Sequence, residues 1–169
     1  MLDINGLEFL VPFIVGTQRT IKIQANLETE TGEPFRKGEK EQTPFEVASS
    51  VGMVGNGFEG TAHLCIPSKV YLHILSKMFG EEMTELDEEL ASGASEIMNI
   101  VYGQAKIILN EKGAGLEKAL PSVIFGSDLK TGRESESIVR VVPFKVPDVG
   151  VFYLEIYVKE KGEDLNEQK

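Results

Sequence analysis

Residues 91–109, ASGASEIMNIVYGQAKIIL, carry the periodicity that decides the fold. At about 100° per residue, Ile97, Val101 and Ile108 fall on one side of a helix, which predicts a face packed against a core. The same periodicity predicts one long helix from about Thr84 to Lys112. Such a helix needs a sheet or another helix to cover its apolar side.

Four residues share the opposite side of this helix: Ser92, Glu96, Asn99 and Gly103. Glu96 and Asn99 are spaced i, i+3, which makes their side chains neighbours on the helix surface. A glycine inside a helix costs up to about 1 kcal/mol relative to alanine, so close approach of another molecule is one reason for Gly103. On spacing alone, an ordinary solvated helix face is the simpler interpretation.

The other segments predict helices and strands from their periodicity and turn residues. In chain order we expect a helix over 4–20, a strand over 20–28, a mobile, charged surface loop over 28–44, two strands (45–55 and 58–66) joined at Asn56-Gly57, a helix over 68–79 ending at Gly80, and, after the long helix, strands over 119–126, 136–146 and 150–160.

This order indicates an internal duplication. The helix, strand and hairpin of residues 4–66 are followed by the same series in residues 84–159, with the segment 67–80 as a connector. We therefore predict one α+β domain over 1–169, a two-layer fold in which helices pack on an antiparallel sheet with pseudo-twofold symmetry. The charged tail 160–169 is expected to fray.

A short alignment links the two predicted halves. Setting Gly16 beside Gly103 brings Phe9 opposite Glu96. This alignment implies that two related helices lie over one sheet, and that only the second carries the polar pair.

Charge and composition exclude several function classes. The chain has 169 residues, 41% of them apolar, which is enough for one sizeable core. Its 27 acidic and 17 basic side chains give a net charge of −10, which disfavours nucleic acids and anionic membranes as partners. A single cysteine, Cys65, allows no internal disulfide and favours a cytoplasmic location. No apolar run approaches the roughly 18 residues of a membrane-spanning helix.

Other candidate chemistry is weaker. The glycines of GMVGNGFEG (52–60) lack the order of a phosphate-binding loop, and a glycine-rich hairpin explains them. His63 and Cys65 would face the same side of a strand, but no further metal ligands are placed with them. His73 has no acidic or nucleophilic partner nearby in the sequence. We therefore expect neither a metal site nor a cofactor of the chain's own.

Three residues separate Ser92 from Glu96, two residues separate Glu96 from Asn99, and Pro121 follows at the start of a strand. This pattern of residues resembles the signature of the CheC, CheX and FliY chemotaxis phosphatases. The opening EFLVPFIVGTQRTI (8–21) has no Glu-x-x-Asn in the first helix and is most similar to the CheX branch, which carries one such site. The resemblance covers nearly the whole chain in element order.

This resemblance implies an enzyme that dephosphorylates the aspartyl phosphate of a CheY-type response regulator. Asn99 would orient the attacking water, and Glu96 would pair with the regulator's active-site lysine. Ser92 and Gly103 would shape the contact surface, and Mg²⁺ would belong to the regulator. A homodimer is expected, because an antiparallel sheet leaves edges that a second copy can cover. The alternative is a non-catalytic module of the same fold that docks a response regulator or a flagellar or signalling protein.

Overall fold

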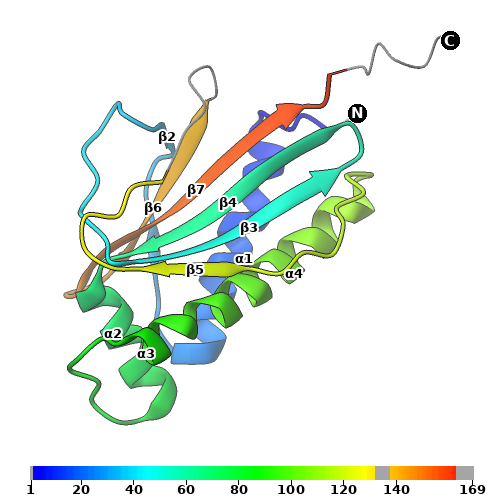
Figure 1. The fold of residues 1–169 in the computed structure, drawn as a ribbon. Coiled ribbons are helices and arrows are strands. Elements are labelled where there is room, and N and C mark those ends of the chain that lie inside the picture. The colour runs from blue at the N-terminus through cyan, green and yellow to red at the C-terminus, as the bar shows by residue number, and fades with distance from the viewer. Residues whose placement is uncertain (1, 132–137, 163–169) are drawn as a thin grey trace, which may run out of the picture.

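One antiparallel sheet with helices on one face forms the molecule, in a computed structural model that describes residues 2–131 and 138–162 (Figure 1). The predicted two-layer α+β fold is confirmed. Its elements in chain order are α1 (Leu7–Ala25), β1 (Glu30–Thr31), β2 (Phe35–Arg36), β3 (Val47–Gly55), β4 (Phe58–Ile66), α2 (Ser68–Phe79), α3 (Glu88–Ser92), α4 (Ala94–Glu111), β5 (Ser122–Phe125), β6 (Val139–Val146) and β7 (Gly150–Glu160).

The strand order has the symmetry of a duplicated fold. The sheet runs β1-β6-β7-β4-β3-β5, with β2 also pairing with β6. Exchanging β1 with β5, β3 with β6 and β4 with β7 reproduces the same order in reverse. The central pair, β4 and β7, is antiparallel, and α1 packs against α4 on the sheet's inner face. The pseudo-twofold axis therefore passes between the two halves at the centre of both layers.

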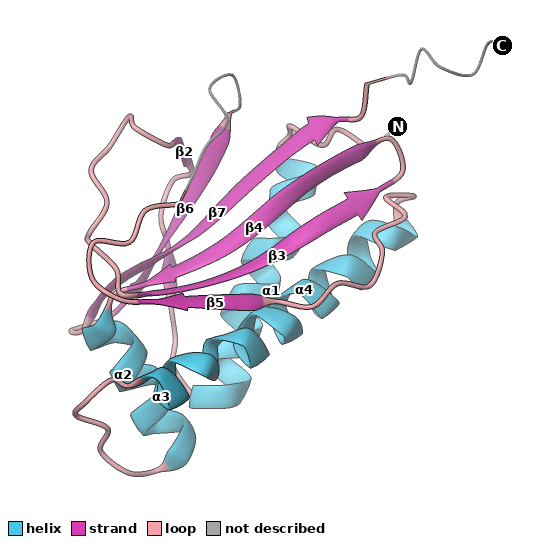
Figure 2. Cartoon of the chain, in the orientation of Figure 1, coloured by secondary structure: helices cyan, strands magenta, loops and turns pink. Residues whose placement is uncertain are grey.

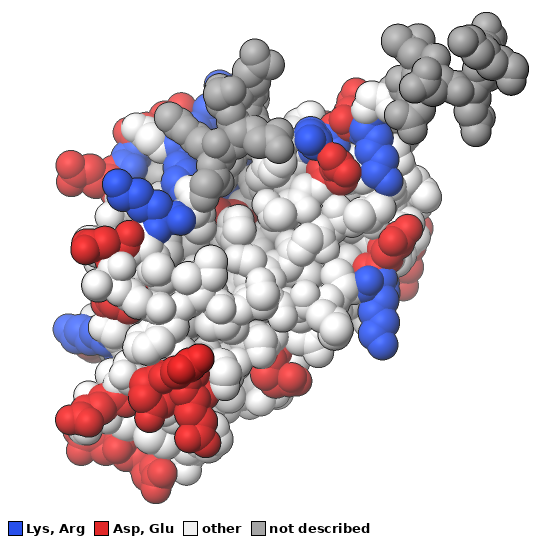
Figure 3. Space-filling view, in the orientation of Figure 1, with Lys and Arg blue, Asp and Glu red and all other residues white. Residues whose placement is uncertain are grey.

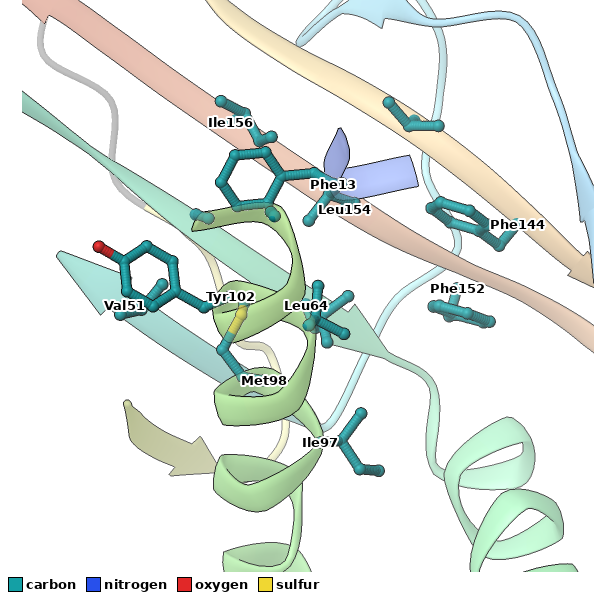
Figure 4. Close-up of a cluster of buried hydrophobic side chains, with 14 of the residues drawn as sticks. Phe13, Val51, Leu64, Ile97, Met98, Tyr102, Phe144, Phe152, Leu154 and Ile156 are labelled. Carbon is teal, nitrogen blue, oxygen red and sulfur yellow. The ribbon is translucent and has the colours of Figure 1, made fainter. Parts of the chain in front are cut away.

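The main core lies between the sheet and the helices. Alternate residues of β7 point into it, as the sequence predicts: Phe152, Leu154, Ile156 and Val158. From the helix layer, α4 contributes Ile97, Met98 and Tyr102, which Figure 4 shows among side chains of the neighbouring strands. Burial of such large apolar side chains supplies about 1.5–3 kcal/mol each and fixes α4 on the sheet.

The first helix is longer than predicted. The expected strand over 20–28 is wrong, because α1 continues to Ala25 and ends at Asn26 in the left-handed conformation (φ 52°). The Thr20 hydroxyl donates to the Gly16 carbonyl oxygen at 2.7 Å, within the helix. Gly16 lies close to α4, since a Cβ there would sit 3.2 Å from the Val101 carbonyl oxygen. Packing against α4 therefore overrides the β propensity of the β-branched residues.

The alignment of Gly16 with Gly103 is also wrong in register. It places Phe9 opposite Glu96, yet Phe9 is fully buried on α1 whereas Glu96 is exposed on α4. Pseudo-equivalent positions of a symmetric fold share their burial. The polar pair therefore has no counterpart at Phe9.

The segment 28–44 is anchored to the sheet rather than free. Its short strands β1 and β2 both pair with β6. Phe35 from β2 and Phe45, just past the segment, lie in a second, smaller core on the outer face of the sheet, with Cys65 and Tyr153. The segment is held because Phe35, inside the polar run, and Phe45, just after it, pack against apolar partners that periodicity does not reveal.

A buried ion pair also anchors this segment. The Glu155 side chain on β7 is fully buried, and Lys37 Nζ lies 2.6 Å from its Oε1. The Thr131 hydroxyl donates to both carboxylate oxygens, at 2.6 Å and 2.8 Å. Lys37 therefore joins the segment after β2 to the centre of the outer sheet face.

The C-terminal strands follow the prediction with shifted ends. The hairpin at Asn56-Gly57 is confirmed, with Gly57 at φ 77°. Strand β5 is shorter than the predicted 119–126, and β6 begins at Val139. Of the predicted frayed tail, Glu160 belongs to β7, and residues 163–169 lie outside the described part of the chain.

Two features are absent from residues 2–131 and 138–162. No helix in this part is both long and apolar enough to cross a membrane. Nor does this part contain a group of three or more histidine, cysteine or acidic side chains placed to hold a metal ion.

Candidate functional site

The helix that carries the candidate site is interrupted. The predicted single helix over 84–112 is wrong, because α3 ends at Ser92 and α4 begins at Ala94, with Gly93 between them (Figure 2). Residues 84–87 precede α3 in extended or irregular conformation. The Asp87 side chain caps α3 by accepting from the Leu90 N–H at 2.8 Å.

This interruption moves the polar pair to the start of a helix. Glu96 lies in the first turn of α4 and Asn99 in the second. A carboxylate in the first turn interacts favourably with the helix dipole. The neighbouring Ile97 and Met98 are almost fully buried, so the backbone beneath the pair is held against the sheet.

Both side chains of the pair are available to a partner. Glu96 and Asn99 are exposed, and within the described residues no hydrogen bond engages either side chain. Ser92, also exposed, donates its hydroxyl to the Glu89 carbonyl oxygen at 2.6 Å. Gly103 is partly buried but open on its Cβ side, with no atom within 4 Å of an added Cβ. The structure therefore leaves Ser92, Glu96 and Asn99 exposed and the Cβ side of Gly103 open.

An exposed carboxylate and carboxamide suggest a particular kind of chemistry. They lie on the outside of a helix, where they cannot exclude water from a small substrate. Catalysis in such a place requires that the partner supply the enclosing site. Glu96 and Asn99 are therefore suited to enter the active site of another protein.

Acidic side chains gather beside this site. Figure 3 shows a dense negative patch at the lower left, over α3 and the segment that joins it to α2. Its exposed members are Glu81, Glu82, Glu85, Asp87, Glu88 and Glu89. A partner with positive charge around its own site fits this field better than an acidic one.

Of the weaker candidates from the sequence, His63 and Cys65 are held within the sheet. The Ser50 hydroxyl bonds His63 Nδ1 at 2.5 Å, and burial lowers the pKa of His63. Cys65 is buried, and burial raises the pKa of its thiol, so it is held in the unreactive protonated form. His73 lines a groove along α2 with Lys69 and Lys77.

Tyr71 is a residue that the sequence does not single out. This fully buried residue of α2 donates its hydroxyl to the carbonyl oxygen of Leu90 in α3, at 2.5 Å. Its position among apolar residues of α2 carries no signal that its hydroxyl reaches another helix. Burial raises the pKa of Tyr71 to about 12, so the hydroxyl remains a donor at all physiological pH values.

The raised pKa predicts an alkaline loss of stability. Because the folded-state pKa of about 12 lies above the usual 10.0, the stability that the neutral hydroxyl contributes is complete below pH 10.0 and is lost as the pH rises towards 12. Chemical unfolding of the native protein and Tyr71→Phe, followed across pH, measures this. The difference in their free energies of unfolding should be constant below pH 10.0 and narrow above it. A pH-independent difference would contradict the assignment.

With a Glu-x-x-Asn pair at the start of a helix over a pseudo-twofold antiparallel sheet, the chain matches one family. The family model described as chemotaxis phosphatase CheX matches residues 47–145, which include Glu96 and Asn99, and the chain belongs to this family.

Individual relatives agree over nearly their whole length. The CheY-P phosphatase CheX of Thermotoga maritima is 28% identical over 155 residues, covering 90% of this chain and 97% of that one. The crystal structure of the chemotaxis protein CheX from Vibrio vulnificus is 30% identical with a TM-score of 0.82, covering 90% of this chain and 99% of that one. CheX in the CheX–CheY–BeF3–Mg²⁺ complex from Borrelia burgdorferi is 25% identical with a TM-score of 0.76, covering 90% and 98%.

Proposed function

We propose that this protein dephosphorylates the aspartyl phosphate of a CheY-type response regulator. Family membership supports the reaction, and a relative at 28% identity is a CheY-P phosphatase. The observation that carries the proposal to this chain is the exposed, unengaged pair of Glu96 and Asn99 in the first two turns of α4. A cytoplasmic location, where response regulators act, belongs to the same proposal.

In the proposed mechanism, α4 brings Asn99 to the regulator's phosphorylated aspartate. The Asn99 carboxamide hydrogen-bonds a water molecule and holds it in line with the phosphorus. The water oxygen forms a bond to phosphorus as the bond to the aspartyl oxygen breaks, which yields inorganic phosphate and the free carboxylate. A neutral carboxamide can orient this water without repelling the phosphoryl oxygens, and positioning is the main requirement of phosphoryl transfer.

Glu96 has a docking role in this mechanism. Its carboxylate, one turn before Asn99, would pair with the regulator's active-site lysine and orient α4. Charge neutralisation by Mg²⁺ would come from the regulator, so this chain needs no metal of its own. The relative from Borrelia burgdorferi in complex with CheY, BeF3 and Mg²⁺ supports a CheY-type partner.

Phosphate release tests the proposal against its alternative, a docking module without activity. A response regulator from the same genome is charged with acetyl phosphate, and release is followed with and without this protein. Acceleration beyond the regulator's own rate supports the phosphatase. Binding to the phosphorylated regulator with no acceleration supports the docking module.

Gly103→Ala should have opposite effects on stability and docking. An added Cβ meets no atom within 4 Å inside the protein, and alanine stabilises a helix interior by up to about 1 kcal/mol relative to glycine. If Gly103 lies against the regulator, the same methyl group should raise KM and leave kcat near the native value. Thermal unfolding and phosphatase kinetics measure both effects. A raised Tm with an unchanged KM would remove Gly103 from the contact surface.

We also propose that a second copy covers the β5 edge of the sheet. Within the described residues, β5 pairs with β3 on one side and has no strand on the other. Leu120, Ile124 and Phe125 on or beside β5 are 82%, 55% and 40% exposed. Light scattering should give about twice the chain mass of 18.6 kDa, and Ile124→Lys should give the single-chain mass.

A further inference from the structure

Gly93 forms the joint between α3 and α4, and Tyr71 of a third helix, α2, holds this joint in place. In a continuous helix, the Leu90 carbonyl oxygen would accept from the N–H four residues later. Here it accepts from the Gly93 N–H at 3.2 Å and from the Tyr71 hydroxyl at 2.5 Å. The same hydroxyl lies 3.5 Å from the Ala91 carbonyl oxygen. The Tyr71 hydroxyl thus donates to carbonyl oxygens that, in a continuous helix, would accept from the next backbone N–H groups.

Gly93 leaves the space that this contact needs. Its backbone angles (φ −60°, ψ −21°) suit any residue, so glycine is not required there by conformation. A Cβ at this position would sit 3.2 Å from the Tyr71 hydroxyl oxygen and 3.3 Å from the Leu90 carbonyl oxygen. Close approach of the hydroxyl is therefore what glycine permits.

The joint stands directly before the candidate site. Glu96 lies three residues after Gly93, and the Ser95 hydroxyl donates back to the Ser92 carbonyl oxygen at 2.8 Å across the joint. The direction in which α4 leaves the joint sets where Glu96 and Asn99 point. A shift of about 1 Å at a catalytic group can cost about a hundredfold in rate.

We propose that the Tyr71 hydroxyl, seated over Gly93, is a positioning residue of the phosphatase site that fixes the start of α4 and thereby the placement of Asn99 on the regulator. This inference rests on the proposed function. It assigns to α2, which carries no part of the Glu-x-x-Asn pair, a role in catalysis through the joint.

Tyr71→Phe and Tyr102→Phe form a matched pair for the test. Tyr102 is a buried tyrosine of α4 whose hydroxyl donates to the Glu117 carbonyl oxygen at 2.6 Å, beyond the far end of that helix. Each variant loses one hydroxyl, whose shortest hydrogen bond to a carbonyl oxygen is 2.5 Å for Tyr71 and 2.6 Å for Tyr102, so their Tm values should fall alike. At a temperature where both are folded, kcat for Tyr71→Phe should fall by between about ten- and a hundredfold, with Tyr102→Phe close to native. Equal kcat values for the two variants would overturn the proposal.

Gly93→Ala tests the same contact from the other side. Its Cβ would sit 3.2 Å from the Tyr71 hydroxyl oxygen and would push it by a few tenths of an ångström, so it should lower kcat in the same direction as Tyr71→Phe. In the double variant the phenylalanine has no oxygen to displace, so the second substitution should add little. If each substitution lowers kcat by its own factor and the two factors multiply in the double variant, the two residues do not act through one contact, and the proposal is contradicted.

Two further outcomes separate this inference from the proposed function. If Asn99→Ala keeps full activity, the proposed site fails, and hydrogen exchange of the α4 amides then decides the joint. Faster exchange over residues 94–99 in Tyr71→Phe but not in Tyr102→Phe supports it, and equal exchange overturns it. If Asn99→Ala is inactive and Tyr71→Phe matches Tyr102→Phe in kcat, the proposed function stands and the positioning role is overturned.

Discussion

Asn99→Ala is expected to abolish acceleration of phosphate release while leaving regulator binding intact. The carboxamide is exposed and makes no hydrogen bond within the described residues, so its removal costs the fold little. Loss of a group that positions the reacting water should lower the single-turnover rate by about a hundredfold or more. Phosphate release at saturating protein measures the rate, and fluorescence anisotropy with beryllofluoride-activated regulator measures binding.

Glu111→Ala is the matched control on the same helix. Glu111 is exposed at the last residue of α4, far along the helix from Asn99. Phosphate release with the Glu111→Ala variant should run at the rate of the native protein. An Asn99→Ala variant that retains the native rate would remove Asn99 from the mechanism.

Lys37→Met is expected to have the largest effect on stability. It leaves the fully buried Glu155 carboxylate without its counter-ion, which lies at 2.6 Å in the native protein. Removing one partner of a buried ion pair costs about 3–5 kcal/mol, because the remaining charge is uncompensated. Urea unfolding should report a loss of this size in the free energy of unfolding.

Two companion variants make this result specific. Lys118→Met removes an exposed lysine and should change the free energy of unfolding by less than about 0.5 kcal/mol. Lys37→Met combined with Glu155→Gln removes both charges, and Thr131 can still donate to the new amide oxygen, so much of the loss should be recovered. A single Lys37→Met variant as stable as Lys118→Met would show that the ion pair contributes little.

Local periodicity predicts most of the fold and fails where distant contacts decide. The alternation of β7 is visible in the sequence because one face of a strand is buried throughout. The run TIKI (20–23) fits either a strand or a helix, and contacts of Gly16 and Thr20 with α4 select the helix. The anchoring of 28–44 depends on Lys37 reaching Glu155, far along the chain, which no local pattern contains.

In the candidate site, too, local spacing predicts some features and distant contacts decide the others. Helical spacing places Glu96 and Asn99 on the exposed side, and both are exposed in the structure. The interruption at Gly93 could not be predicted, because Gly93 and Gly103 look alike in sequence and only Gly93 meets a hydroxyl from another helix. The assignment of Glu96 and Asn99 to catalysis stays a prediction from family resemblance and exposure.

The most direct test is a crystal structure of this protein bound to a CheY-type regulator carrying Mg²⁺ and beryllofluoride. The account predicts that α4 enters the regulator's active site, with the Asn99 carboxamide beside the beryllofluoride and the Glu96 carboxylate paired with the active-site lysine. A complex in which α4 lies outside the interface would contradict the central claim.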